Sequence, residues 1–274
     1  MLETIAILNI LLPFLYAITT AAYVYDFFKE RKSINNAKRI ILFITLLFHL
    51  VYLFSRMIEY DHPPITNKFE IFSILAFSIA FSYFVLELLT DIRGTGSFII
   101  FFSLVFQIVS SISIEDNYIV PDVLRNRLLG LHVISALLGY SGITISAVYG
   151  ILFLILYKNL RSSRFGIIFN RLPSLEILEK LSFYSVVIGF ILLSIAIFIG
   201  IIWLPSAFPN YSYTDPKLVS TGFVWVVYLS VILSKYILTW YGKKVIIFSL
   251  FGFLLTMLSL ILTSILPNTF HAFY

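Results

Sequence analysis

Residues Leu181–Pro205 read LSFYSVVIGFILLSIAIFIGIIWLP, a run without Asp, Glu, Lys or Arg. A helix needs about 20 apolar residues to cross the roughly 30 Å of hydrocarbon in a bilayer. We therefore expect this run to be a membrane-spanning helix. Working outward from it, the same criterion gives about eight candidate spans along the chain. They are Ile5–Phe28, Ile40–Tyr60, Phe69–Thr90, Ser97–Ile114, Leu128–Tyr157, Leu181–Pro205, Leu218–Tyr241 and Val245–Leu266.

The composition supports the same fold class. The chain of 274 residues is 60% hydrophobic and only 12% charged, whereas a soluble domain carries about 25% charged residues. No run alternates with the two-residue period of an outer-membrane strand, so a β-barrel is not expected. The chain has no Cys, which excludes disulfides, thiolate metal sites and Cys nucleophiles. We predict an all-α, polytopic membrane helix bundle that forms one integral-membrane domain over residues 1–274.

Charge sets the expected orientation. Lys and Arg gather in the loops after the first, third, fifth and seventh candidate spans. Loops rich in Lys and Arg stay in the cytoplasm, so we expect both termini outside and the chain in the cytoplasmic (inner) membrane. The first apolar run has basic residues after it and none before it, which favours a retained helix over a signal peptide. The net charge of +5 reflects these loops, and nucleic-acid binding is not expected.

The histidines are the most informative polar residues. On this topology His49 lies inside the second span, whereas His62, His132 and His271 fall near the outer face. Buried ionisable residues in membrane spans are functional candidates, and imidazole can ligate haem iron. Ordinary interfacial histidines would give the same spacing. A zinc site is a further alternative, but the chain has no HxxxH or HExxH motif.

Two kinds of charged residue accompany these histidines. Arg56 follows His49 by two helical turns, so both should face the same side of the second span. Arg56 suits an anion such as a haem propionate, but it could also snorkel to the interface or pair with Glu59. Glu70 and Glu87 lie near opposite ends of the third span and are expected to be interfacial.

Several strings resemble the cytochrome c assembly protein family, which includes CcsA and HemX. Residues 61–70, DHPPITNKFE, are similar to its G-H-x-P-[LI]-[ST]-N-x-[YF]-E segment. Residues 131–140, LHVISALLGY, are similar to its L-H-V-x-x-x-x-L-x-Y helix. Asp215-Pro216-Lys217 matches the end of its tryptophan-rich segment. The shared order of these motifs extends the resemblance from about His49 to Tyr274.

The resemblance implies a haem-handling membrane protein. In this family two external histidines, here His132 and His271, serve as axial haem ligands beside a platform loop, here Phe208–Lys217. His62 corresponds to one of a pair of internal histidines. The cofactor would be haem b, held transiently or substoichiometrically, and a ResB-like membrane protein and apocytochrome c would be partners.

Residues of the platform loop also have alternatives of their own. Tyr211 and Tyr213 are placed to stack on a porphyrin, or they belong to the aromatic belt at the membrane surface. Asp215 is placed to hydrogen-bond an imidazole, or it caps the seventh span, since Pro216 suits a first helical turn. With His49 and Arg56, these residues complete the expected cofactor contacts.

The chain also departs from the family pattern. The loop before Asp215 contains no Trp, Leu218 stands where the family has Glu, and Leu233 and Ser234 fall where a second internal His is expected. These departures favour the HemX branch. We expect a protein of c-type cytochrome biogenesis that presents haem outside, with no catalytic residues and at most a subunit role in a haem-lyase system. The alternative is a HemX-type regulator that lowers the level of glutamyl-tRNA reductase.

Overall fold

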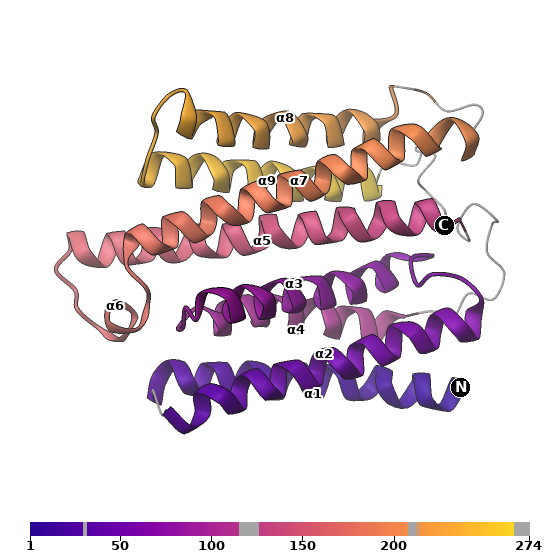
Figure 1. Cartoon of the computed structure of the whole chain (residues 1–274), viewed down its shortest axis with the longest axis horizontal. Coiled ribbons are helices and arrows are strands. Elements are labelled where there is room, and N and C mark those ends of the chain that lie inside the picture. The colour runs from indigo at the N-terminus through magenta and orange to yellow at the C-terminus, as the bar shows by residue number, and fades with distance from the viewer. Residues whose placement is uncertain (30–31, 115–125, 208–211, 213, 266–274) are drawn as a thin grey trace. The chain divides into compact units, whose positions relative to one another are not determined.

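The computed structural model describes residues 1–274 apart from 30–31, 115–125, 208–211, 213 and 266–274 (Figure 1). Over that range the chain forms helices and no strand, which confirms the all-α prediction. The helices are α1 (Leu2–Lys29), α2 (Lys32–Tyr60), α3 (Lys68–Thr90), α4 (Gly96–Ser113), α5 (Arg127–Arg161), α6 (Ile167–Arg171), α7 (Leu175–Ala207), α8 (Pro216–Tyr236) and α9 (Lys243–Ile265).

Seven of these helices are long and apolar enough to cross a membrane, counting only the described residues. They are α1 to α5, α7 and α8, so the chain is a polytopic helical membrane protein. The eighth candidate span, Val245–Leu266, overlaps α9 but runs past the described residues. An eighth span, the outward orientation of both termini and a single domain over 1–274 stay predictions.

The seventh candidate span, Leu218–Tyr241, is longer than the helix that forms. α8 ends at Tyr236, and the backbone then turns, with positive φ angles of 51° at Thr239 and 59° at Gly242. The N–H of Trp240 bonds back to the carbonyl of Ser234 at 3.1 Å, which closes the last helical turn. Because apolar side chains continue through this turn, hydropathy does not mark the end of the helix.

The described helices group into two compact units. Unit 1 comprises residues 1–130 and 164–173, and unit 2 comprises residues 131–163 and 174–274. In unit 1, α1 packs against α2 and α4, and α3 packs against α4 (Figure 1). The loop that carries α6 joins this unit, where the Arg171 guanidinium donates to the carbonyl of Phe28 at 3.4 Å.

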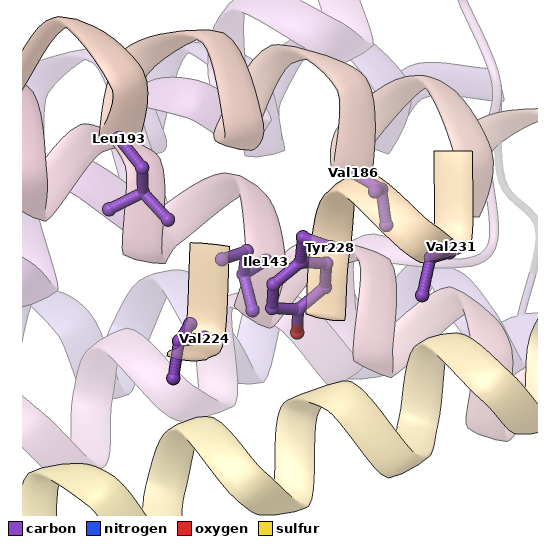
Figure 2. Close-up of a cluster of buried hydrophobic side chains, with 6 residues drawn as sticks. All are labelled: Ile143, Val186, Leu193, Val224, Tyr228 and Val231. Carbon is purple, nitrogen blue, oxygen red and sulfur yellow. The ribbon is translucent and has the colours of Figure 1, made fainter. Parts of the chain in front are cut away.

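Unit 2 contains most of α5 together with α7, α8 and α9. Figure 2 shows its apolar core, to which three helices contribute. The buried members are Ile143 of α5, Val186 and Leu193 of α7, and Val224, Tyr228 and Val231 of α8. Phe248 and Phe253 of α9 pack against this cluster from the side.

Glycines let α5 and α7 approach closely within unit 2. A Cβ added at Gly142 of α5 would lie 3.0 Å from the Cα of Gly189 on α7. One added at Gly139 would lie 3.0 Å from the carbonyl oxygen of Gly189. Small residues at helix crossings in membranes allow such backbone contact. As a result, side chains of α5 reach the backbone of α7.

Candidate functional site

His132 lies on the second turn of α5 and is half-buried. Its Nδ1 is 2.7 Å from the carbonyl oxygen of Ala196 on α7. Because a carbonyl oxygen only accepts hydrogen bonds, Nδ1 must carry a proton, and a neutral ring then keeps a lone pair on Nε2. No described residue hydrogen-bonds Nε2. This is a form in which imidazole ligates metals.

Asp215 precedes α8 and caps its first turn. Its carboxylate accepts from the backbone N–H of Lys217 at 2.8 Å, and Pro216 occupies the start of the helix. The capping interpretation is therefore confirmed, while a hydrogen bond from Asp215 to an imidazole stays a prediction. Lys217, on the first turn of α8, interacts electrostatically with the His132 imidazole.

Three of the predicted haem contacts lie outside the described residues. They are His271, Tyr211 and Tyr213. Within the platform loop Phe208–Lys217, the hydroxyls of the described Ser212 and Thr214 are 2.8 Å apart. The second axial ligand and the aromatic platform therefore stay predictions.

His49 is fully buried near the middle of α2. Its Nδ1 is 2.9 Å from the Tyr16 hydroxyl of α1, and its Nε2 is 3.0 Å from the Ser73 hydroxyl of α3. The Ser73 hydroxyl donates to the Gln107 side chain of α4 at 3.2 Å. Since a hydroxyl has one proton, Ser73 must accept from Nε2, and a neutral ring then accepts from Tyr16 at Nδ1. Both ring nitrogens of His49 are occupied, and one hydrogen-bonded chain links all four helices.

The chain of hydrogen bonds continues beyond Gln107. The Gln107 amide donates to the Ser111 hydroxyl at 3.0 Å, and Asn9 donates to the Ser111 carbonyl at 3.1 Å. The Tyr52 hydroxyl in turn donates to Asn9 at 3.3 Å. This network was not predicted from the sequence, although polar residues such as Ser73 and Gln107 inside apolar spans were a usable signal.

Arg56 forms a buried ion pair near the end of α2. Its Nη2 is 2.9 Å from Glu70 Oε1, and the two side chains are 2% and 1% exposed. The other Glu70 oxygen accepts from the backbone N–H and the hydroxyl of Thr66, each at 2.8 Å. Glu70 is therefore paired inside the protein, while its depth relative to the membrane surface stays a prediction. Glu59, the partner offered for Arg56, lies 3.8 Å from the amino group of Met1.

His49 and Arg56 share one side of α2, as their spacing predicted. Both contact Tyr52: the His49 and Tyr52 ring centroids are 6.2 Å apart, and the Arg56 guanidinium lies 5.9 Å from the Tyr52 ring. Arg56 also lies 4.8 Å from the Tyr60 ring. Contact of His49 or Arg56 with haem stays a prediction.

His62 lies in the turn between α2 and α3. Its Nδ1 is 2.9 Å from the carbonyl of Pro63, and its side chain packs against Tyr60 with ring centroids 6.0 Å apart. Asp61, with a φ of 54°, turns the chain out of α2 just before it. His62 is 3% exposed, and its contact with haem also stays a prediction.

A second buried charge cluster lies at the opposite end of α2 and α3. Glu87 is fully buried, accepts from the Tyr23 hydroxyl at 2.5 Å, and lies 3.6 Å from Lys38 and 3.7 Å from Arg39. Lys38 also pairs with Asp26 at 2.5 Å. Glu87 is therefore paired inside the protein, and the presence of Lys38 and Arg39 on α2 was a usable signal for this pairing. Its depth relative to the membrane surface stays a prediction.

The described histidines are divided between the two units. His49 and His62 belong to unit 1, and His132 belongs to unit 2. Among the described residues, no three His, Asp or Glu side chains gather in a way that would hold a metal ion. Any iron held by His132 would therefore need a porphyrin or a ligand outside the described range to complete its coordination.

Comparison with known proteins adds a family and several relatives. The family model described as "Cytochrome C assembly protein" matches residues 92–271. The cytochrome c biogenesis protein CcsA of Guillardia theta is 26% identical over 239 residues, covering 80% of this chain and 79% of the relative. CcsA of Prochlorococcus marinus (strain MIT 9301) is 24% identical over 296 residues, covering 99% and 94%.

One similar protein has a different name. Protein HemX of Brevibacillus brevis is 24% identical over 231 residues, covering 81% of this chain and 82% of the relative. Its identity to this chain is no higher than that of the CcsA proteins of Guillardia theta and Prochlorococcus marinus, and most of these relatives are CcsA proteins. The predicted closeness to the HemX branch is therefore unsupported.

Proposed function

We propose the function of this chain from one premise: the chain belongs to the cytochrome C assembly protein family. We infer that it handles haem in c-type cytochrome biogenesis, the process named in its CcsA relatives. It would do so as a multi-pass protein of the cytoplasmic membrane, holding haem b transiently or substoichiometrically at the outer face.

The geometry of His132 is the observation that carries this proposal. The bond from Nδ1 to the Ala196 carbonyl leaves Nε2 as the nitrogen available for iron. Metal-ligating histidines commonly donate their other ring N–H to a backbone carbonyl or a carboxylate, which fixes the ring. The nearby cation of Lys217 suits the negative propionates of haem. The described residues at this end of unit 2 thus fit a haem group.

The remaining contacts follow from the family resemblance. His271 would supply the second axial ligand, while Tyr211 and Tyr213 would stack on the porphyrin. Asp215 would keep the start of α8 in place through its cap. His62, His49 and Arg56 would contact haem only on its way to the outer site. Bound haem would supply the vinyl groups that become thioether bonds in a c-type cytochrome.

The chain would not perform this attachment alone. It contains no Cys and no recognised catalytic motif, so the proposal assigns it the presentation of haem. A ResB-like membrane protein would be its partner, and apocytochrome c would be the acceptor. The chain would be at most one subunit of a haem-lyase system.

Purified protein carrying two substitutions tests the haem site. In His132→Ala/His271→Ala protein, the low-spin Soret and α bands should disappear while the protein still inserts and elutes as a single species. A matched control is Leu131→Ala, because Leu131 neighbours His132 but is 54% exposed. Bands of equal intensity in the double variant and the control would remove His132 and His271 from consideration.

The HemX relative supports a second candidate function, which is regulation. In that case the chain would lower the level of glutamyl-tRNA reductase without presenting haem. A deletion strain separates the two by haem-stained gels and a reductase immunoblot. Loss of covalent haem from c-type cytochromes supports the biogenesis role. Intact c-type cytochromes with raised reductase would support regulation and contradict the first proposal.

The outer placement of His132 depends on the predicted orientation. The absence of Cys makes single-cysteine labelling direct. With both termini outside, Thr4→Cys should react with an impermeant maleimide in intact cells. Ser163→Cys, in the loop between α5 and α6, should react only after the membrane is permeabilised. The reverse pattern would place His132 at the cytoplasmic face.

A further inference from the structure

Two residues on one turn of α7, Ala196 and Gly200, lie next to the His132 ring. The Ala196 carbonyl accepts from His132 Nδ1 at 2.7 Å. In an α-helix this carbonyl also faces the N–H of Gly200, four residues on. A carbonyl oxygen has two lone pairs, so it can accept from both donors. The ring is therefore held by a backbone carbonyl, which is present whatever side chain residue 196 carries.

Gly200 provides the space for the ring. A Cβ added at this position would lie 3.0 Å from both Cε1 and Nδ1 of His132. Carbon atoms that are not bonded prefer about 3.5–4.0 Å, so a side chain at residue 200 would require the ring to shift by a few tenths of an ångström and would disturb its bond to the Ala196 carbonyl. Gly200 lies within α7 and is required for this close approach, not for an unusual backbone angle.

We propose that Gly200 and the Ala196 carbonyl form a positioning element that holds His132 as the Nδ1–H tautomer and selects Nε2 as its ligating nitrogen. The proposal rests on the proposed haem function only for the identity of the ligand. The tautomer and its dependence on residue 200 can be measured without haem. Gly200 is a positioning residue, since it acts through His132 and touches no ligand itself.

Loss of this element has a defined consequence. If the ring leaves the Ala196 carbonyl, its proton can move to Nε2, and that nitrogen then donates and cannot ligate. Changes to the partners of ligating histidines typically weaken metal binding about 10–100-fold. Gly200→Ala should therefore weaken haem binding by about tenfold or more, while leaving the apolar core of unit 2 intact.

The control is another helical glycine. Gly222 lies on α8, and a Cβ added there meets no atom within 4 Å. Gly200→Ala and Gly222→Ala add the same methyl group and the same helix propensity, so they differ only in contact with the imidazole. Both variants would be prepared as full-length protein in nanodiscs.

Nitrogen-15 NMR of the imidazole rings gives the first measurement, with His132 assigned by His132→Gln. Wild-type protein and Gly222→Ala should show a protonated Nδ1 and an unprotonated Nε2 at His132. Gly200→Ala should show a mixture of tautomers. A protonated Nε2 in neutral wild-type His132 would overturn the proposal, even if Gly200→Ala failed to fold.

Haemin titration gives the second measurement. Gly200→Ala should show the tenfold loss of binding, and Gly222→Ala should match wild type. Equal tautomers and equal haem binding in the two variants would overturn the proposal. If wild-type protein binds no haem but the tautomer responds to Gly200→Ala alone, the positioning element stands and the proposed haem function fails.

Discussion

His49 and His132 differ in their burial and in how many of their ring nitrogens are hydrogen-bonded. His49 in unit 1 is fully buried, and both its ring nitrogens are hydrogen-bonded, to Tyr16 and Ser73. His132 in unit 2 is half-buried, and among the described residues its one hydrogen-bond partner is a backbone carbonyl at Nδ1. A metal bound to His49 would break one of its two hydrogen bonds to Tyr16 and Ser73. A metal bound to Nε2 of His132 would break no hydrogen bond that the structure describes. The difference indicates that unused bonding capacity, more than burial, distinguishes a candidate ligand from a structural residue.

Several charged side chains of unit 1, like His49, have their partners inside the protein. Arg56 with Glu70, and Lys38 with Asp26, are paired inside the protein. Buried pairs of this kind contribute little when intact but are costly to break, because one charge remains without compensation. Unit 1 should therefore respond to substitutions mainly in stability, and the His132 end of unit 2 mainly in haem binding.

The largest effect is expected from Arg56→Ala. This change leaves Glu70 buried and uncompensated and should lower the free energy of unfolding by about 3–5 kcal/mol. The matched control is Arg93→Ala, since Arg93 pairs with Asp91 at 3.2 Å on the surface, 47% exposed, and should cost at most about 1 kcal/mol. Denaturant unfolding in mixed micelles measures both, and equal losses would break the contrast between buried and surface charge.

A smaller effect is expected from His49→Ala. Its removal leaves the Tyr16 hydroxyl without its bond to the imidazole and leaves Ser73 with only its bond to Gln107. The resulting gap in the hydrogen-bonded chain should cost about 2 kcal/mol. His132→Ala loses one bond to an already bonded helix carbonyl and should cost less than about 1 kcal/mol. The same unfolding measurement applies, and a larger loss in His132→Ala would reverse the assignment of structural and ligand roles.

The smallest effect is expected at the cap of α8. Asp215→Ala removes the acceptor for the Lys217 N–H and should cost about 1 kcal/mol, whereas Asp215→Asn should keep the cap and most of the stability. Thermal unfolding checks this order. Haem binding sharpens the comparison: if Asp215→Asn is stable yet loses haem, the carboxylate charge acts on the ligand site beyond its capping role.

Much of the fold was predictable because it depends on local composition. Apolar runs such as Phe69–Thr90 and Ser97–Ile114 predicted α3 and α4 to within a few residues. The end of α8 was not predictable in this way, since the turn at Thr239 and Gly242 lies among apolar residues. Hydropathy indicates which segments avoid water, but it does not indicate where the backbone turns.

The candidate site was predictable only in part. The residue types of the site were predictable because the strings around His132 and Asp215 resemble those of a known family, whereas the spacing of the histidines alone left ordinary interfacial residues as an alternative. The partners of these residues were not predictable: Ala196 is 64 residues from His132 and acts through its backbone, so its identity leaves no mark in the sequence. The pairing of Arg56 with Glu70 was hidden for a related reason, since helix packing decides which charges of separate spans meet.

The central claim is that His132, and not His49, binds haem iron. The most direct test is the absorption spectrum of the reduced protein, measured per folded molecule, in His132→Ala and His49→Ala. The account predicts that His132→Ala loses the low-spin Soret and α bands although it remains stable. It predicts that His49→Ala, although less stable, keeps them in its folded fraction. Retained bands in His132→Ala together with lost bands in His49→Ala would contradict the account.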